Sequence, residues 1–167
     1  EFAFYRERWA LRRIFGYEFP TSASAIRGQV VESGINMFLN GLPIEEAKEK
    51  MLAEYDENCS RINDPKIEDE RNNLVPLFEL GTKKFQDYAY RWRLIDYQRK
   101  VEGQIDDIPF IGYTDFYFED NHTREDFFID LKTSKNLPQK VSISHAMQQA
   151  IYQKATNAKQ LLWYLKT

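Results

Sequence analysis

Two charged residues interrupt an apolar segment in the second half of the chain. In "FFIDLKTSK", residues 127–135, Asp130 and Lys132 stand among side chains typical of a buried strand. A buried charge is costly unless it is paired or binds a metal. Because side chains alternate between the faces of a strand, Asp130 and Lys132 emerge side by side, while Ile129 and Leu131 point into the core. The segment therefore predicts a strand that presents a carboxylate and an ammonium together.

The preceding apolar segment, "FIGYTDFYF", carries a third charge, Asp115. The turn-forming "DNHTRED" separates the two segments, so an antiparallel hairpin would bring Asp115 close to Asp130. Two adjacent carboxylates repel, and one must take a proton unless a cation neutralises them. Oxygen ligands suit Mg²⁺ or Mn²⁺, and Lys132 could hold a water or a phosphate oxygen. The alternative is a buried Asp130–Lys132 ion pair, with Asp115 as a turn residue.

Polar side chains on two predicted helices could reach the same place. Gln148 and Tyr152 are four residues apart, so they share one face of a helix. Glu32 lies in "RGQVVE" on an earlier helix, and its carboxylate could contact the same metal. His145, near the start of the later helix, is interpreted as a capping or surface residue.

The order and spacing of these motifs resemble the PD-(D/E)xK nuclease superfamily, in its RecB-like exonuclease branch. The matching segments are "RGQVVESGINMFL", "GYTDFYF", "FFIDLKTSK" and "QQAIYQ", and they cover residues 27–152. In that branch a metal-binding histidine usually follows the glycine of the first segment, and here Glu32 stands in its place. The chain has one cysteine, Cys59, so the iron–sulfur cysteines of some relatives are absent.

The resemblance implies a role for each matching residue. Asp115 and Asp130 bind the metal with the backbone carbonyl of Leu131, and Glu32 completes the ligands directly or through water. Lys132 orients or activates the attacking water and stabilises charge on the scissile phosphate. The implied catalytic set is Asp115, Asp130, Lys132, Gln148 and Tyr152. The residues expected to contact or position DNA are Arg27, Thr133, Ser134, Gln148 and Tyr152.

The activity implied is metal-dependent hydrolysis of DNA phosphodiester bonds, with Mg²⁺ or Mn²⁺ and two ions once DNA is bound. An exonuclease is favoured over an endonuclease, in DNA repair, recombination or phage DNA processing, with a larger complex as a conceivable setting. The alternative is a catalytically inactive nucleic-acid-binding module that keeps the fold. The intact set of Asp115, Asp130 and Lys132 argues against that alternative, since an inactive domain has no need of three charges in a sheet.

Apolar periodicity and turn signals define the elements that must position these residues. Helices are expected over residues 1–17, 23–40, 43–62, 67–97 and 142–157, the fourth either continuous or restarted at Pro76. Strands are expected over residues 99–106, 109–119, 126–133 and 160–166. Because the last strand follows a helical crossover, we expect it to lie parallel to a neighbour. The predicted fold is α/β: a restriction-endonuclease-like core with a mixed sheet of about four strands flanked by helices. Residues 1–167 form one domain, mainly helical over 1–97, with the sheet core over 98–167.

Composition narrows the class of protein. A length of 167 residues, of which 43% are hydrophobic, suits one domain with a sizeable core. No signal peptide is visible at the start of the sequence and no run of about 18 apolar residues occurs in it, so we expect a cytoplasmic protein with no membrane span. The net charge of −3 argues weakly against a protein whose whole surface binds nucleic acid. The basic, aromatic-rich residues 83–100 fit either a phosphate-binding groove or one solvated face of an amphipathic helix.

Overall fold

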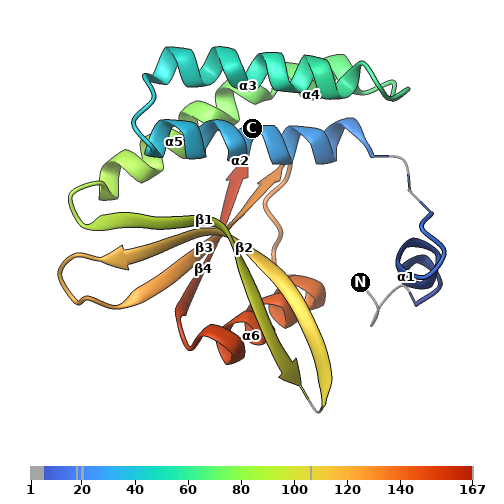
Figure 1. Cartoon of the computed structure of the whole chain (residues 1–167). Helices are drawn as coiled ribbons and strands as arrows, with labels where there is room; N and C mark the ends of the chain where they lie inside the picture. The colour runs from blue at the N-terminus through green and yellow to red at the C-terminus, as the bar shows by residue number, and fades with distance from the viewer. Residues whose placement is uncertain (1–5, 18, 20, 106, 167) are drawn as a thin grey trace.

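The structure is a computed structural model that describes residues 6–17, 19, 21–105 and 107–166. Its elements are α1 (Arg6–Arg13), α2 (Ala23–Leu39), α3 (Ile44–Cys59), α4 (Ile67–Asn72), α5 (Leu74–Tyr88), β1 (Trp92–Ile105), β2 (Ile108–Asp120), β3 (Asp126–Ser134), α6 (Ile143–Thr156) and β4 (Lys159–Lys166). In Figure 1 helices α2 to α5 lie together on one side of the sheet, α6 lies on the other, and α1 stands apart. None of the described helices is long and apolar enough to cross a membrane.

The sheet has the strand order β1-β2-β3-β4. β1 pairs with β2 and β2 pairs with β3, both antiparallel, whereas β4 returns through α6 and pairs with β3 in parallel. This arrangement confirms the expected α/β fold with a mixed four-stranded sheet flanked by helices. It also confirms the antiparallel hairpin of the two charged strands and the parallel last strand.

Each face of the sheet packs against different helices. The larger core joins α2, α3 and α5 to the sheet residues Phe116, Phe118, Phe127, Ile129, Leu131 and Leu165. A smaller cluster under α6 contains Tyr117, Phe128, Tyr152 and Ala158. Because Phe128 belongs to one cluster and Ile129 to the other, β3 alternates as predicted and buries both of its faces.

Helix α2 carries two of the predicted site residues, and local signals determine its ends. The side chain of Ser22 caps its first turn by accepting a hydrogen bond from the Ala25 amide at 3.3 Å. The helix ends before Asn40, and Gly41 supplies a φ of 94° that other residues rarely adopt. Inside the helix, a side chain at Gly34 would meet Met51 of α3 at 3.0 Å, so this glycine lets the two helices pack closely.

The helix expected over residues 67–97, either continuous or restarted at Pro76, is confirmed as far as Tyr88 and is wrong beyond it. The structure breaks it at Asn73, ends α5 at Tyr88, and begins β1 at Trp92. Core-facing and exposed positions alternate at the start of β1, because Trp92 and Leu94 pack on the larger core while Arg93 between them is exposed. Pro76 lies in the first turn of α5, where its missing N–H costs nothing.

The first helix also differs from its expected range of residues 1–17. α1 ends at Arg13, before Gly16, which has a φ of 68°. Residues 1–5 of the expected helix lie outside the described part of the chain.

Candidate active site

The predicted metal-binding residues lie where two strands separate. β2 pairs with β3 only from Phe116–Ile129 to Glu119–Asp126, while β3 continues along β4 as far as Ser134. Asp115 and Asp130 are the next residues on the two strands, so both stand at the fork between them. The Leu131 amide donates to Asp115 Oδ2 at 2.7 Å and fixes that carboxylate across the fork. The expected approach of Asp115 to Asp130 is thus explained by the end of the strand pairing.

Asp130 is buried at the base of the fork, with 2% of its surface exposed. Lys132 lies beside it, with Nζ 2.9 Å from Oδ1 and 2.8 Å from Oδ2. Gln148 of α6 reaches the same carboxylate, with Nε2 3.4 Å from Oδ1. Despite its closeness to Lys132, Oδ2 has no hydrogen bond of good geometry among the described residues. A buried carboxylate oxygen without such a bond is suited to a cation.

Glu32 acts on the same group of charges from α2. Burial, followed by the charges of Glu32 and Asp130, raises the pKa of Asp115 to about 8, against the opposing effect of Lys132. Burial likewise raises the pKa of Glu32, although hydrogen bonds from Gln98 and Tyr97 oppose the rise. These carboxylates are close enough to affect one another's pKa, which agrees with the expectation that Glu32 could approach Asp115 and Asp130.

The ammonium of Lys132 is held in its charged form by its neighbours. Burial alone would lower the pKa of Lys132, but the charges of Asp130, Asp115 and Glu32 outweigh burial and raise it. Lys132 therefore keeps its proton in the absence of a metal. In that state it can stabilise a phosphate oxygen but cannot accept a proton from water.

The donor set fits a hard divalent cation. Three carboxylates, on α2, β2 and β3, affect one another's charge, and an all-oxygen set of this kind suits Mg²⁺ or Mn²⁺. Among the described residues, no three His, Cys, Asp or Glu side chains are already spaced to coordinate an ion. The Leu131 amide binds one oxygen of Asp115 and Lys132 lies beside Asp130, so an ion would share both carboxylates with these donors.

Tyr152 acts as a brace under the sheet. Its ring contacts Phe128, with 5.8 Å between ring centroids, and its hydroxyl accepts a hydrogen bond from the Tyr113 amide at 3.1 Å. A Cβ at Gly112 would meet the Tyr152 ring at 2.3 Å, so the close approach of β2 to α6 requires glycine there. Since Tyr152 is only 9% exposed, this geometry favours bracing over direct contact with DNA.

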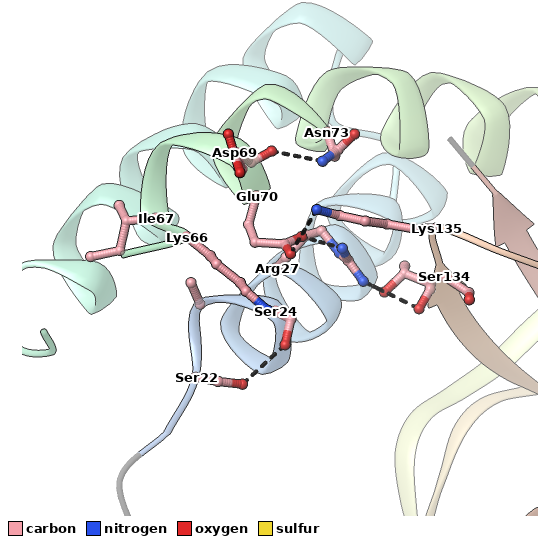
Figure 2. Close-up of polar contacts among 12 residues, drawn as sticks. Ser22, Ser24, Arg27, Lys66, Ile67, Asp69, Glu70, Asn73, Ser134 and Lys135 are labelled. Carbon is pink, nitrogen blue, oxygen red and sulfur yellow. Dashed lines mark hydrogen bonds and ion pairs between the residues drawn. The ribbon is translucent and has the colours of Figure 1, made fainter. Parts of the chain in front are cut away.

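Arg27 lies in a buried ion-pair network at the end of β3 (Figure 2). It pairs with Glu70 of α4, and its Nη2 donates to Thr133 at 3.3 Å to the carbonyl and 3.2 Å to the hydroxyl. Lys135 reaches the other oxygen of Glu70 at 3.3 Å. Ser134 donates its hydroxyl to the Asn136 carbonyl at 2.6 Å. Because Arg27 is 5% exposed and already paired, it is better placed to hold β3 than to bind a phosphate.

Three further polar residues near the site, Tyr97, Gln98 and Tyr164, were not predicted from the sequence, because no motif marks them. Gln98 of β1 donates from Nε2 to Glu32 Oε1 at 3.3 Å and to the Tyr97 hydroxyl at 3.2 Å. On the other side of the site, Tyr164 is the β4 partner of Lys132, and its hydroxyl lies 2.9 Å from Nδ1 of His145. Alternation along residues 92–100 could have predicted the strand that carries Tyr97 and Gln98, but not their contacts with α2.

The basic, aromatic segment over residues 83–100 is largely structural. Phe85 and Trp92 pack in the core, and Tyr88 stacks on Trp92 with 4.0 Å between ring centroids. Arg91 pairs with Asp120 and Arg93 with Glu119. Tyr90 differs in being 81% exposed. The aromatic residues therefore mainly build the core, and two of the basic residues have acidic partners.

Comparison with known proteins gives one family. Residues 6–164 match the family model of the PD-(D/E)XK nuclease superfamily. No curated protein matches the chain. Six chains of solved structures match. One, titled "Crystal structure of SSO0001", has 14% sequence identity and a TM-score of 0.41 over 95% of this chain and 69% of that chain, a likeness too low to carry an argument.

The family model covers the fork and all of the residues around it. Asp115, Asp130 and Lys132, which the sequence predicts as site residues, lie within the matched range on two adjacent strands of a mixed sheet. The chain therefore belongs to the PD-(D/E)XK nuclease superfamily.

Proposed function

We propose that this chain is a metal-dependent deoxyribonuclease of the RecB-like branch that degrades DNA from its ends. The observation that carries the proposal is the convergence of Asp115, Asp130 and Lys132 at one fork, with Glu32 close enough to raise the pKa of both Asp115 and Lys132. Nucleases of this superfamily generally use divalent metal ions, and the oxygen-only donor set favours Mg²⁺ or Mn²⁺.

Each residue at the fork then has a distinct role. Asp115, Asp130 and Glu32, with the Leu131 carbonyl, would hold the metal. Once bound, the metal lowers the pKa of a water molecule and offsets negative charge on the phosphate. Lys132, which keeps its proton, binds a phosphate oxygen and stabilises charge there. With three carboxylates in the site, two cations can be held when a phosphate supplies further oxygens.

The supporting residues keep this geometry in place. Gln148 orients the Asp130 carboxylate, and Tyr152 braces β2 against α6. Thr133 and Ser134 lie at the end of β3, where Thr133 also accepts from Arg27. We place Thr133, Ser134 and Gln148 along the DNA path, with Arg27 acting through Thr133. A role in repair, recombination or phage DNA processing, within a larger complex, would fit an enzyme that acts on DNA ends.

The activity is tested with linear and closed circular DNA, in Mg²⁺, in Mn²⁺ and in chelator. We expect the parent chain to degrade linear DNA only with metal and to spare the circle. Lys132→Ala should lower the rate on the order of 10² to 10³, because it removes a group that stabilises transition-state charge. Lys135→Ala is the matched control, since Lys135 pairs with Glu70 away from the fork. Cleavage in chelator, or an unaffected Lys132→Ala variant, would contradict the proposal, and binding without cleavage would favour the inactive module.

Metal binding should strengthen as the pH rises toward 8. Because the pKa of Asp115 is raised to about 8, a cation must displace its proton at lower pH. Affinity should rise by up to about tenfold per pH unit and level off above that pKa. Mn²⁺ titrations across this pH range test this prediction, and a pH-independent affinity would exclude Asp115 as a ligand.

The same carboxyl also affects stability in the absence of metal. It favours the folded state below its unfolded pKa of about 3.9, and this contribution is lost as the pH rises to about 8.

A further inference from the structure

Gln98 has an unusual backbone conformation for a strand residue, two positions after the register shift between Leu94 and Asp96 in β1. Its φ is 50°, in the left-handed region that residues other than glycine, asparagine and aspartate rarely enter. Three further non-glycine residues have a positive φ, and each lies where a chain turns or a helix ends: Asp107, Arg124 and Asn157. Among the described residues, Gln98 is the one of these four inside a strand. Strain of this kind persists where the surrounding structure enforces it, often at functional sites.

The strained residue lies on the strand next to β2, at the same level as the fork. The pairs Tyr97–Phe116 and Arg99–Thr114 flank it, so Gln98 stands opposite Asp115. Asp115 is also where β2 leaves β3. The distortion in β1 therefore occurs at the same level of the sheet as the proposed metal site.

The side chain of Gln98 points to a site residue and not to the core. Its Nε2 donates to Glu32 Oε1 at 3.3 Å and to the Tyr97 hydroxyl at 3.2 Å. Tyr97 also lies close enough to Glu32 for the two groups to affect each other, since Glu32 raises the pKa of Tyr97 and Tyr97 lowers that of Glu32. Because Gln98 is exposed, burial of apolar surface does not account for the strain. What the conformation achieves is a pair of polar groups, from β1, that hold the carboxylate of α2.

We propose that Gln98 is a positioning residue that aims Glu32 at the metal site. This inference rests on the proposed function. The neutral amide donates to one oxygen of Glu32 without adding a fourth negative charge beside Asp115 and Asp130. The left-handed backbone turns that amide toward α2. Groups that orient metal ligands in this way typically contribute 10- to 100-fold, in order of magnitude, to metal affinity or activity.

Two substitutions separate this role from a purely structural one. Gln98→Gly removes the amide but relieves the backbone, so it should unfold at the same temperature as the parent chain or higher. Gln98→Met removes the hydrogen bonds but keeps the strain, so its unfolding temperature should not rise. Both variants should bind Mn²⁺ roughly 10- to 100-fold more weakly than the parent chain and lose nuclease activity to a similar extent. If Gln98 had only a structural role, the Mn²⁺ affinity of the two variants would change in parallel with their unfolding temperature.

The matched control is Asn157→Gly, which relieves a φ of 54° at the end of α6. It should keep the parent affinity for Mn²⁺, measured by calorimetric titration of the metal alone. If Gln98→Gly and Gln98→Met both bind Mn²⁺ like the parent chain, the inference is wrong even if the parent cleaves DNA. A parent chain that binds Mn²⁺ through Glu32 but cleaves no DNA would refute the proposed function and leave the inference standing. A parent chain that binds no Mn²⁺ would overturn both.

Discussion

Asp130→Asn should abolish DNA cleavage while the chain stays folded and still binds DNA. The substitution replaces a carboxylate oxygen by an amide group of almost the same volume, so the packing beneath the fork is preserved. It removes a negative charge that the proposed metal requires, and it takes from Lys132 the partner 2.8 Å away. A loss of several kcal/mol of transition-state stabilisation lowers the rate by about 10³-fold or more, at roughly 1.4 kcal/mol per factor of ten.

The measurement compares rates of DNA hydrolysis in Mg²⁺ with DNA affinity from fluorescence anisotropy. Asp126→Asn is the matched control, because it makes the same change at the exposed start of the same strand. The control loses only a hydrogen bond from the Tyr117 hydroxyl at 3.2 Å and should cleave like the parent chain. If Asp130→Asn cleaves DNA at the parent rate, Asp130 is not a metal ligand.

Glu70→Ala should cost the fold about 3–5 kcal/mol in free energy of unfolding. Its carboxylate is 4% exposed and is the acidic partner of Arg27, whose side chain is 6% exposed. Without Glu70, the guanidinium would remain buried without a countercharge, and its Nε already has no hydrogen-bond partner. The loss is a large part of the roughly 5–15 kcal/mol that stabilises a domain.

Urea denaturation gives the size of the effect, and two comparisons identify its cause. Asp56→Ala breaks an exposed ion pair with Arg71 and should cost no more than about 1 kcal/mol. The double variant Arg27→Met with Glu70→Leu should recover most of the stability, because it leaves no buried charge unpaired. A double variant as unstable as Glu70→Ala would show that packing, not the orphaned charge, explains the loss.

The sequence was sufficient to predict the part of the site that depends on short-range pattern. Alternation along residues 127–132 placed Asp130 and Lys132 on one face, and the turn before them implied the hairpin that brings Asp115 near. The parallel last strand followed from the helical crossover. Each of these inferences needs only neighbouring elements.

Long-range contacts could not be read in the same way. Arg27 and Glu70 are 43 residues apart, and nothing local to either indicates that they meet in the interior. Along residues 92–98 the alternation typical of a strand is short and is interrupted by a register shift between Leu94 and Asp96, so the same basic and aromatic side chains also satisfied a helical pattern. The hydrogen bond from Gln98 to Glu32 of α2 likewise joins residues 66 positions apart, and it forms only in the folded chain.

The early end of the pairing between β2 and β3 divides the hairpin of β1 and β2 into two parts. The pairs from Trp92–Asp120 to Tyr97–Phe116 belong to the four-stranded sheet. From Arg99–Thr114 to Ile105–Ile108 the two strands pair only with each other and form an arm. The hydrogen bond from Leu131 to Asp115 anchors the arm at its root, and Tyr152 supports it from below. Because the arm is joined to the sheet only at the level of Asp115, a change in its length at the tip would alter how far it extends from the sheet while leaving the fork itself unchanged.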